Sequence, residues 1–230
     1  MPAVICSAVL QGVEALPVSV EVDVSPGLPA VTIVGLPDVA VQEARERVRS
    51  AIRQSGWEFP LRRITINLSP ADVKKVGTHF DVPIAVGILV ASGQLPPAVI
   101  EGKMFTGELT LEGRVLPIRG ATIFASLAKT EKKICVVPKA NQSEVEVCRQ
   151  VSYSSLVHLE DLRQDLPVQI AVGPSAPDEM PEMMWWPSIR GQANAKRALT
   201  IACAGRHNIL FIGPPGAGKN RPCRRSSTRN

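Results

Sequence analysis

The feature that most restricts how this chain can fold is a glycine-rich segment near its C-terminal end. Residues 213–219 read GPPGAGK, which fits the pattern GxxxxGK, and the apolar run ILFI precedes them directly. In such a loop the glycines let backbone N–H groups turn inward to hold phosphates, and the lysine reaches the β- and γ-phosphates. We therefore predict a short buried strand over 209–212 followed by a phosphate-binding loop; the alternative is a chance Gly/Pro turn.

The residue after Lys219 departs from this pattern. Phosphate-binding loops carry Ser or Thr there, because the hydroxyl binds Mg²⁺, whereas this chain has Asn220. The helix expected next would begin R-P-C-R-R, which has no apolar face to bury. No acidic strand of the kind that completes an ATP-hydrolysing site follows in the 230 residues. We therefore expect this chain to lack ATPase activity.

Charge separates the last fifth of the chain from the rest. Residues 1–187 carry 17 Lys/Arg and 21 Asp/Glu, whereas residues 188–230 carry 9 Lys/Arg and no acid. A basic block can bind polyanions, although a terminal segment can also be basic by accident. Residues 220–230 contain four arginines and no aliphatic residue, so we expect an unstructured basic tail.

A shifted reading frame would explain both Asn220 and the tail. Lys-Asn-Arg-Pro-Cys can be encoded AAA AAC CGN CCN TGC, and deleting one A yields a frame that starts Lys-Thr. That frame permits a Leu and an Ala two and three positions after the Thr, as expected of a helix after a phosphate-binding loop. We hypothesise that residues 220–230 are out of frame.

Strand and helix patterns follow one another in mixed order through residues 1–170. Period-two and short apolar runs predict strands over 3–10, 16–24, 30–35, 62–70, 133–138 and 152–159. Helices are expected from Pro37 and Asp38 onward, and over 82–95, 121–132, 141–150 and 160–166, with a loop over 72–81 and a hairpin over 105–120 that turns at Glu112–Gly113. Because strands and helices do not alternate strictly, the pattern favours an α+β fold.

The helix that begins near Asp38 has a clear apolar face. Its members recur at helical spacing: Val41, Ala44, Val48, Ala51 and Ile52. Four arginines lie largely elsewhere on it: Arg45, Arg47, Arg49 and Arg53. They could contact nucleic acid, but Glu43 and Glu46 are interleaved, and we favour a solvated face.

Composition indicates a water-soluble protein. Hydrophobic residues make up 45% of the chain, which is enough for a sizeable core. The longest apolar run, residues 82–91, is too short for a membrane span of about 20 residues. The N-terminus lacks the basic start of a secretory signal. The five cysteines are scattered, so we expect reduced thiols and a cytoplasmic location.

Residues 171–187 separate the two parts of the chain. They contain four prolines and no periodicity, which is typical of a linker. Trp185 and Trp186 at its end are expected to dock on a neighbouring domain rather than stack on a ligand. Beyond it, Ser188 is expected to cap a segment that becomes helical from about Gln192.

The chain resembles the ComM/YifB family, the magnesium-chelatase-like AAA+ proteins of bacteria. The resemblance runs through nearly all of residues 1–219, in the stretches VGLPDVAVQEARERVRSAI, ITINLSPADVKKVGTHFDVPIAVGIL, FTGELTLEGRVLPIRG and IRGQANAKRALTIACAGRHNILFIGPPGAGK. It implies a hexameric motor that uses ATP and Mg²⁺ and acts on DNA, in natural transformation and branch migration. By the same resemblance the domains are a Lon-like N-terminal domain (1–170), the linker (171–187), the start of an AAA+ domain (188–219) and the tail.

The resemblance also implies a fold and an altered site for the first domain. That domain is similar to the Lon protease catalytic domain, a ribosomal S5 domain 2-like fold, whose chemistry needs a Ser nucleophile and a Lys base. Matching the family's segments places His79 at the serine position and Thr122 at the lysine position. Both catalytic positions look lost. His79 and Asp81 could still form an acid–base pair, but we favour a structural role for them.

The nucleotide site is carried over residue by residue from the family. Ile189, Gly191 and Gln192 match the segment that lies near the adenine. The phosphate loop comprises Gly213, Pro214, Pro215, Gly216, Ala217, Gly218 and Lys219, with Asn220 as the departure. We expect no catalytic or metal-binding residues, and ATP, Mg²⁺, DNA and self-assembly are expectations for the intact family rather than for this chain. The alternatives are a non-catalytic binding or oligomerisation module and, less favoured, a Lon-like protease.

Overall fold

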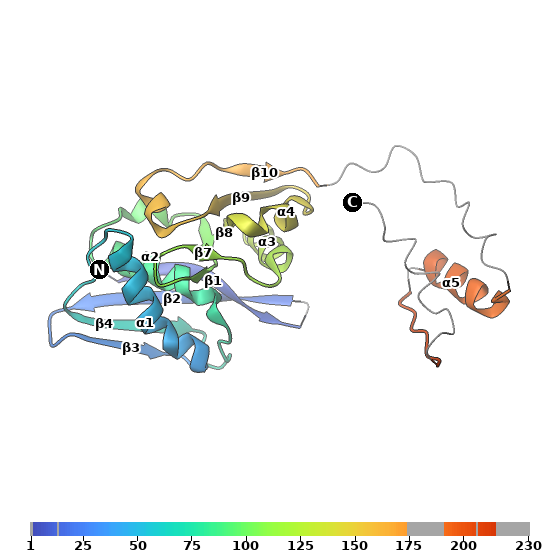
Figure 1. Cartoon of the computed structure of the whole chain (residues 1–230), viewed down its shortest axis with the longest axis horizontal. Helices are drawn as coiled ribbons and strands as arrows, with labels where there is room; N and C mark the ends of the chain where they lie inside the picture. Colours follow the sequence, from blue (N-terminus) through green and yellow to red (C-terminus); the bar gives the residue numbers. More distant parts are fainter. Residues whose placement is uncertain (1, 13, 174–190, 206, 215–230) are drawn as a thin grey trace. The chain divides into compact units, whose positions relative to one another are not determined.

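The computed structural model describes residues 2–12, 14–173, 191–205 and 207–214 (Figure 1). They belong to two compact units, residues 1–175 and residues 176–230. The first unit contains a mixed sheet with helices on both faces. The second contains one helix among its described residues.

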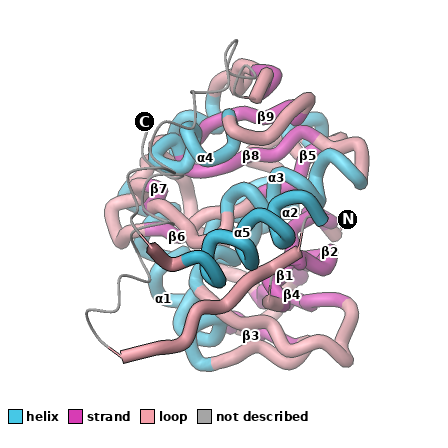
Figure 2. Tube along the Cα trace, turned by 90° about the vertical axis from the view of Figure 1, so that its right-hand side faces the viewer, coloured by secondary structure: helices cyan, strands magenta, loops and turns pink. Residues whose placement is uncertain are grey.

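The sheet of the first unit combines antiparallel and parallel pairs. In the described residues its order is β10-β9-β8-β5-β1-β2-β4-β3, and Figure 2 shows β9, β8 and β5 toward one end of the sheet and β4 and β3 toward the other. Its strands are β1 (Ala3–Gln11), β2 (Glu14–Ser25), β3 (Ala30–Val34), β4 (Arg63–Ser69), β5 (Lys103–Phe105), β8 (Ile134–Pro138), β9 (Val151–Leu156) and β10 (Gln169–Ala171). A separate hairpin pairs β6 (Glu108–Leu109) with β7 (Val115–Leu116). The expected mixture of α and β structure is confirmed.

The helices divide between the two faces of the sheet. They are α1 (Val39–Gln54), α2 (Asp81–Ala91), α3 (Ala121–Thr130) and α4 (Gln142–Glu146), with short 3-10 turns η1 (Thr78–Phe80), η2 (Pro97–Val99), η3 (Lys139–Asn141) and η4 (Leu159–Arg163). One core cluster joins α1 and α2 to β1, β2 and β4, and a second joins α3 to β5, β8 and β9. Alternation along β5 separates them: Met104 belongs to the second cluster and Phe105 to the first.

Helix α1 forms as its pattern predicts. The Asp38 carboxylate accepts a hydrogen bond from the Val41 N–H at 2.8 Å and so caps the first turn. All five residues of the predicted apolar face are buried. Burying side chains of this kind stabilises the fold by about 2 kcal/mol each for the larger ones.

Helix α2 is enclosed by protein nearly along its whole length. Nine of its residues, from Asp81 to Leu89, are buried. Gly87 allows the helix to approach the sheet, because a Cβ there would lie 2.5 Å from Val22 Cγ2 and 2.8 Å from Ile5 Cδ1. In the described ranges no helix combines the length and the apolar character needed to cross a membrane.

Several expected elements differ from those observed. The strands β5 and β10 were not predicted, because three-residue segments are too short to show a period. The helix expected over 160–166 is the 3-10 turn η4. Strand β10 extends through Ala171, the first residue of the expected linker; residues 174–190, with Trp185, Trp186 and Ser188, lie outside the described residues.

In the second unit one prediction is confirmed and one is wrong. The helix expected from about Gln192 is α5 (Ala193–Gly205). The buried strand expected over 209–212 does not form, and Leu210 and Ile212 are 80% and 89% exposed. A strand exists only through its hydrogen-bonded ladder, and the described part of this unit offers no neighbouring strand.

Four of the five cysteines lie within the described residues. Cys6, Cys135, Cys148 and Cys203 are free, and Cys223 lies outside the described residues. Cys135 is buried in the second core cluster, and burial raises the pKa of its thiol to about 12. It therefore serves as an apolar core residue.

Candidate functional site

The nucleotide-site residues are only partly within the described structure. Gly191 and Gln192 precede α5, and the Gln192 carbonyl accepts a hydrogen bond from the Lys196 N–H at 2.9 Å. Gly213 and Pro214 are exposed and belong to no helix or strand. The other predicted site residues lie outside the described residues: Ile189, Pro215, Gly216, Ala217, Gly218, Lys219 and Asn220. The phosphate-binding loop therefore stays a prediction.

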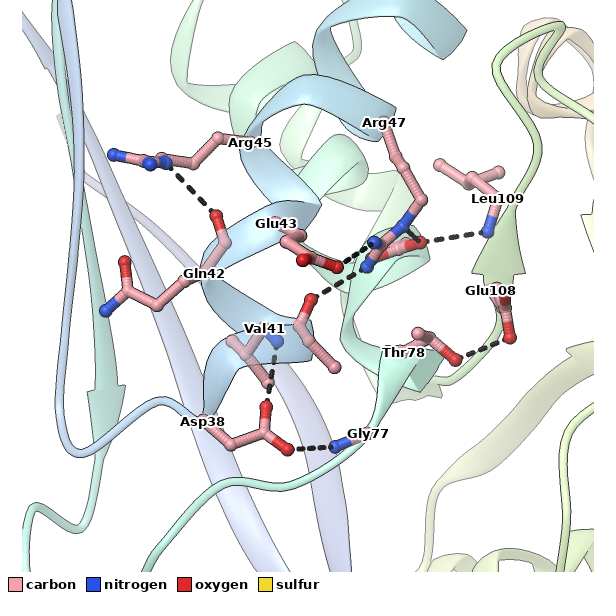
Figure 3. A network of polar contacts seen from close by, with 12 residues as sticks. Asp38, Val41, Gln42, Glu43, Arg45, Arg47, Gly77, Thr78, Glu108 and Leu109 are labelled. Carbon is pink, nitrogen blue, oxygen red and sulfur yellow. Dashed lines mark hydrogen bonds and ion pairs between the residues drawn. The ribbon is translucent and has the colours of Figure 1, made fainter.

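The first unit contains a network of polar contacts between α1, the N-terminus of α2 and β6 (Figure 3). At its centre Arg47 donates from Nε to Asp81 Oδ2 at 2.8 Å and from Nη2 to Asp81 Oδ1 at 3.0 Å. Asp81 is fully buried and also accepts a hydrogen bond from the Leu109 N–H at 3.2 Å. One carboxylate thus joins three elements.

Arg47 corrects the expectation that the α1 arginines form one solvated face. Figure 3 shows Arg45 and Arg47 leaving the helix on opposite sides. The Arg47 side chain is only 20% exposed and also bonds the Ala40 carbonyl at 2.9 Å. Helical periodicity could not reveal this, because the partner, Asp81, lies 34 residues away in the sequence.

The environment of this pair shifts both of its pKa values. Burial raises the pKa of Asp81 to about 6, while the hydrogen bond and charge of Arg47 act in the opposite direction. The bond to Asp81 raises the pKa of Arg47, so the guanidinium stays charged. Arg47 Nε and Nη2 and both carboxylate oxygens of Asp81 are hydrogen-bonded within the protein, so the pair has a structural role.

The loop that precedes α2 is tied to the start of α1 by further contacts. Asp38 Oδ2 accepts a hydrogen bond from the Gly77 N–H at 3.3 Å, and the Asp38 N–H donates to the Lys75 carbonyl at 2.9 Å. Thr78 Oγ1 donates to the Glu108 carboxylate, which connects the same loop to β6. The segment 72–81, which we expected to be a loop, therefore ends in the 3-10 turn η1, and these hydrogen bonds connect it to the start of α1 and to β6.

His79 is buried beside β1 and is hydrogen-bonded to its backbone. The parallel strands β1 and β5 pair at Cys6 and Met104, and beyond that point the Ala8 carbonyl receives the His79 Nε2–H at 2.9 Å. The His79 ring packs against Phe80 and Phe124, with centroids 4.3 and 5.1 Å away. Burial lowers the pKa of His79, so the neutral ring donates from Nε2.

The structure supports the structural interpretation of His79 and Asp81. His79 donates to a backbone carbonyl, whereas Asp81 is occupied by Arg47 and the Leu109 N–H. Thr122 lies in the first turn of α3, where its carbonyl accepts a hydrogen bond from Cys148 Sγ at 3.8 Å. Through Phe124, two residues further along α3, His79 contacts that helix.

A second site candidate is an open groove of about 650 Å³ beside the C-terminal ends of α1 and α2. Its basic and aromatic lining comprises Arg53, Trp57, Phe59 and Arg62, and we call it the Arg–aromatic groove. The guanidinium carbon of Arg163 lies 4.0 Å from the Trp57 ring centroid, and that of Arg49 lies 5.8 Å from the Phe59 centroid. Sequence reasoning missed this groove; the available signal was the run of two aromatics and two arginines in residues 57–63.

Two family models match the chain one after the other. The model described as subunit ChlI of Mg-chelatase matches residues 20–141, which is more than half of the chain. The chain belongs to the magnesium-chelatase-like family of ComM and YifB. A second model of this family, described as magnesium chelatase, subunit ChlI, matches residues 186–228. That match continues past Lys219, beyond the point at which we expected the resemblance to end.

Curated proteins of this magnesium-chelatase-like family match over almost all of the chain. It is 40% identical over 220 residues to the uncharacterized protein YifB of Salmonella typhimurium, covering 94% of this chain and 44% of that protein. It is 39% identical over 226 residues to the competence protein ComM of Haemophilus influenzae, with the same coverage. It is 34% identical over 220 residues to the uncharacterized protein Rv2897c of Mycobacterium tuberculosis, covering 93% of this chain and 43% of that protein. The chain therefore spans less than half the length of these relatives.

Proposed function

We propose that this chain carries the N-terminal domain and the first motor segment of an ATP-driven, oligomeric DNA-processing protein. The observation that carries the proposal is the order of the two family matches, with the GPPGAGK motif inside the second. One relative, ComM of Haemophilus influenzae, is a competence protein by name, which agrees with this proposal. Assembly into a hexamer and a cytoplasmic location belong to the same proposal.

The GPPGAGK motif has the residues needed to bind nucleotide phosphates, but the position after it lacks the hydroxyl that binds Mg²⁺. Gly213, Gly216 and Gly218 would offer backbone N–H donors, and the Lys219 ammonium would hold the β- and γ-phosphates. A bound Mg²⁺ supplies charge neutralisation at those phosphates. Asn220 offers an amide where a hydroxyl serves in this class of loop, so we propose weak nucleotide binding and no ATP hydrolysis by the 230-residue polypeptide.

Two measurements test the nucleotide proposal. Titration with a fluorescent ATP analogue should show weak binding that Lys219→Ala abolishes, because the lysine is the only positive charge in the loop motif. Phosphate release in the presence of Mg²⁺ should equal that of the Lys219→Ala variant. Release at an ordinary motor rate would contradict the proposed inactivity.

A chimaera tests the motor proposal separately. Residues 1–219 would be joined to the remaining motor segments of the Haemophilus influenzae protein, so that the phosphate loop continues into Thr or Ser and a full motor. We expect ATP hydrolysis that DNA stimulates and Lys219→Ala removes. A chimaera that hydrolyses ATP with no response to any DNA would count against the DNA motor.

A non-catalytic binding module is the second candidate function. It is favoured by the first unit, which has its own core and a polar network whose groups satisfy one another. Partner capture by the chain without nucleotide turnover would support this module. We propose no Lon-like proteolysis, since the nucleophile position carries a buried, hydrogen-bonded histidine. Peptidase activity that His79→Ala abolishes would contradict this.

A further inference from the structure

We propose that the Arg–aromatic groove of the first unit binds single-stranded DNA. This inference rests on the proposed function, because the DNA processed by the motor supplies the strand. It goes beyond that function by placing a DNA contact on the N-terminal domain, away from the phosphate-binding loop. It also assigns a role to Arg45, Arg49 and Arg53, the arginines of α1 that take no part in the Arg47–Asp81 pair.

The groove has the shape and position of a binding surface rather than of a core cavity. Its walls come from the end of α1, residues 57–62, and the end of α2 with Ser92 and Gln94, which follow that helix. Gln94 holds the middle of this segment in place: its amide donates to the Glu58 carbonyl and accepts from the Glu58 N–H, both at 2.8 Å. These two hydrogen bonds hold residue 58 beside the end of α2, while the groove itself is open to solvent.

The positive charges at the groove have no carboxylate partner within the part of the chain that the structure describes. Arg49, Arg53 and Arg62 are exposed, and none of them forms an ion pair among the described residues. Arg45, Arg49 and Arg53 are spaced four residues apart, so they form one stripe along α1 that leads to the groove. Glu46 and Glu58 lie among these four arginines in the sequence, and Glu43 forms an ion pair with Arg47, so the arginines at the groove outnumber the remaining carboxylates of this stretch.

The aromatic rings are what single out nucleic acid among anionic partners. Trp57 and Phe59 are half-buried, and each already has a guanidinium near its ring, from Arg163 and Arg49. Proteins that bind single strands combine such rings, on which bases stack, with cations that follow the phosphates. An acidic peptide would use the arginines but not the rings. A duplex hides its base faces, so the groove favours a single strand.

Fluorescence anisotropy of a labelled oligothymidylate with the full chain tests this. Arg53→Gln with Arg62→Gln should weaken binding and reduce the slope of log affinity against log salt by about 1.4, or about 0.7 for each lost phosphate contact. Phe59→Leu keeps an apolar side chain but removes the ring, and should weaken binding at least about fivefold. The matched control, Arg114→Gln with Arg119→Gln, removes two exposed charges outside the groove and should leave the affinity within about twofold.

Each other outcome overturns the proposal. If the groove variant and the control variant lose the same affinity, the DNA is attracted by the net charge of the chain, including that of the basic C-terminal segment, and not by the groove. Full retention of binding by Phe59→Leu would mean that the rings take no part, and tighter binding of a duplex would exclude a single-strand groove. In those cases the DNA-stimulated activity of the chimaera can still stand, so failure here is separate from failure of the motor proposal.

Discussion

A single buried carboxylate holds three elements of the first unit together. Asp81 has its charge balanced by Arg47 and its remaining position filled by the Leu109 N–H. Removing one partner of a buried pair leaves an uncompensated charge, which costs about 3–5 kcal/mol. Arg47→Ala should therefore lower the free energy of unfolding by about 3 kcal/mol, measured by urea denaturation. Arg45→Ala, on the opposite side of the same helix, should cost less than about 0.5 kcal/mol.

His79 should make stability depend on pH. Because its pKa is lowered in the folded state, below about pH 6.5 the unfolded chain binds a proton that the folded chain does not. The free energy of unfolding should therefore fall as the pH falls, by at most about 1.4 kcal/mol per pH unit. Denaturation of the wild type and of His79→Gln between pH 8 and pH 5 measures this contribution as the difference between the two proteins.

The comparison of the wild type with His79→Gln is needed because Asp81 changes the free energy of unfolding with pH in the opposite direction. Its folded-state pKa of about 6 lies above that of an unfolded aspartate, about 3.9. Between these values the folded chain binds more protons, so this residue alone makes the protein more stable as the pH falls. Both proteins contain Asp81, so its effect cancels in the difference. A difference that stays constant from pH 8 to pH 5 would contradict the assignment to His79.

Among the helices and strands, sequence periodicity predicted those whose formation depends on residues close together in the sequence. The buried face of α1, the hairpin at Glu112–Gly113 and the strands β1 and β2 follow directly from alternation and turn residues. The short strand β5 escaped prediction because its position is set by the neighbours β1 and β8 rather than by its own residues. The strand expected over 209–212 was wrong for the same reason, since an apolar run becomes a strand only beside a partner.

The contact of α2 with the sheet gives a test at this scale. Alanine is favoured over glycine inside a helix by about 1 kcal/mol. At Gly87, however, a methyl group would overlap Val22 and Ile5, and overpacking costs about 1–3 kcal/mol. Gly87→Ala should therefore destabilise the protein in urea unfolding. Val22→Ala in the Gly87→Ala background should cost less than Val22→Ala alone; equal costs would show that the two sites do not touch.

For the whole molecule, motifs predicted the family but not the sites of the first unit, and the nucleotide-binding segment that they indicate stays a prediction. GPPGAGK is contiguous, so it could be recognised without a fold. The two residues of the Arg47–Asp81 pair are 34 residues apart in the sequence, and the groove forms only where residues 53–62 meet residues 91–94, so these sites exist only in the fold. His79 was noticed in sequence, but its hydrogen bond to Ala8 spans 71 residues and could not be predicted from its neighbours.

The division into two units predicts how the chain responds to a protease. Residues 171–187 contain four prolines and the glutamates Glu179 and Glu182, and such composition is typical of segments that proteases reach first. A glutamate-specific protease in brief digestion should cut there and leave a stable fragment close to residues 1–175, which have a core of their own. Mass spectrometry identifies the fragment, and its thermal unfolding should match that of the first unit in the intact chain. A resistant fragment that retains Lys219 would show that the boundary lies elsewhere and that residues assigned to the second unit pack on the first.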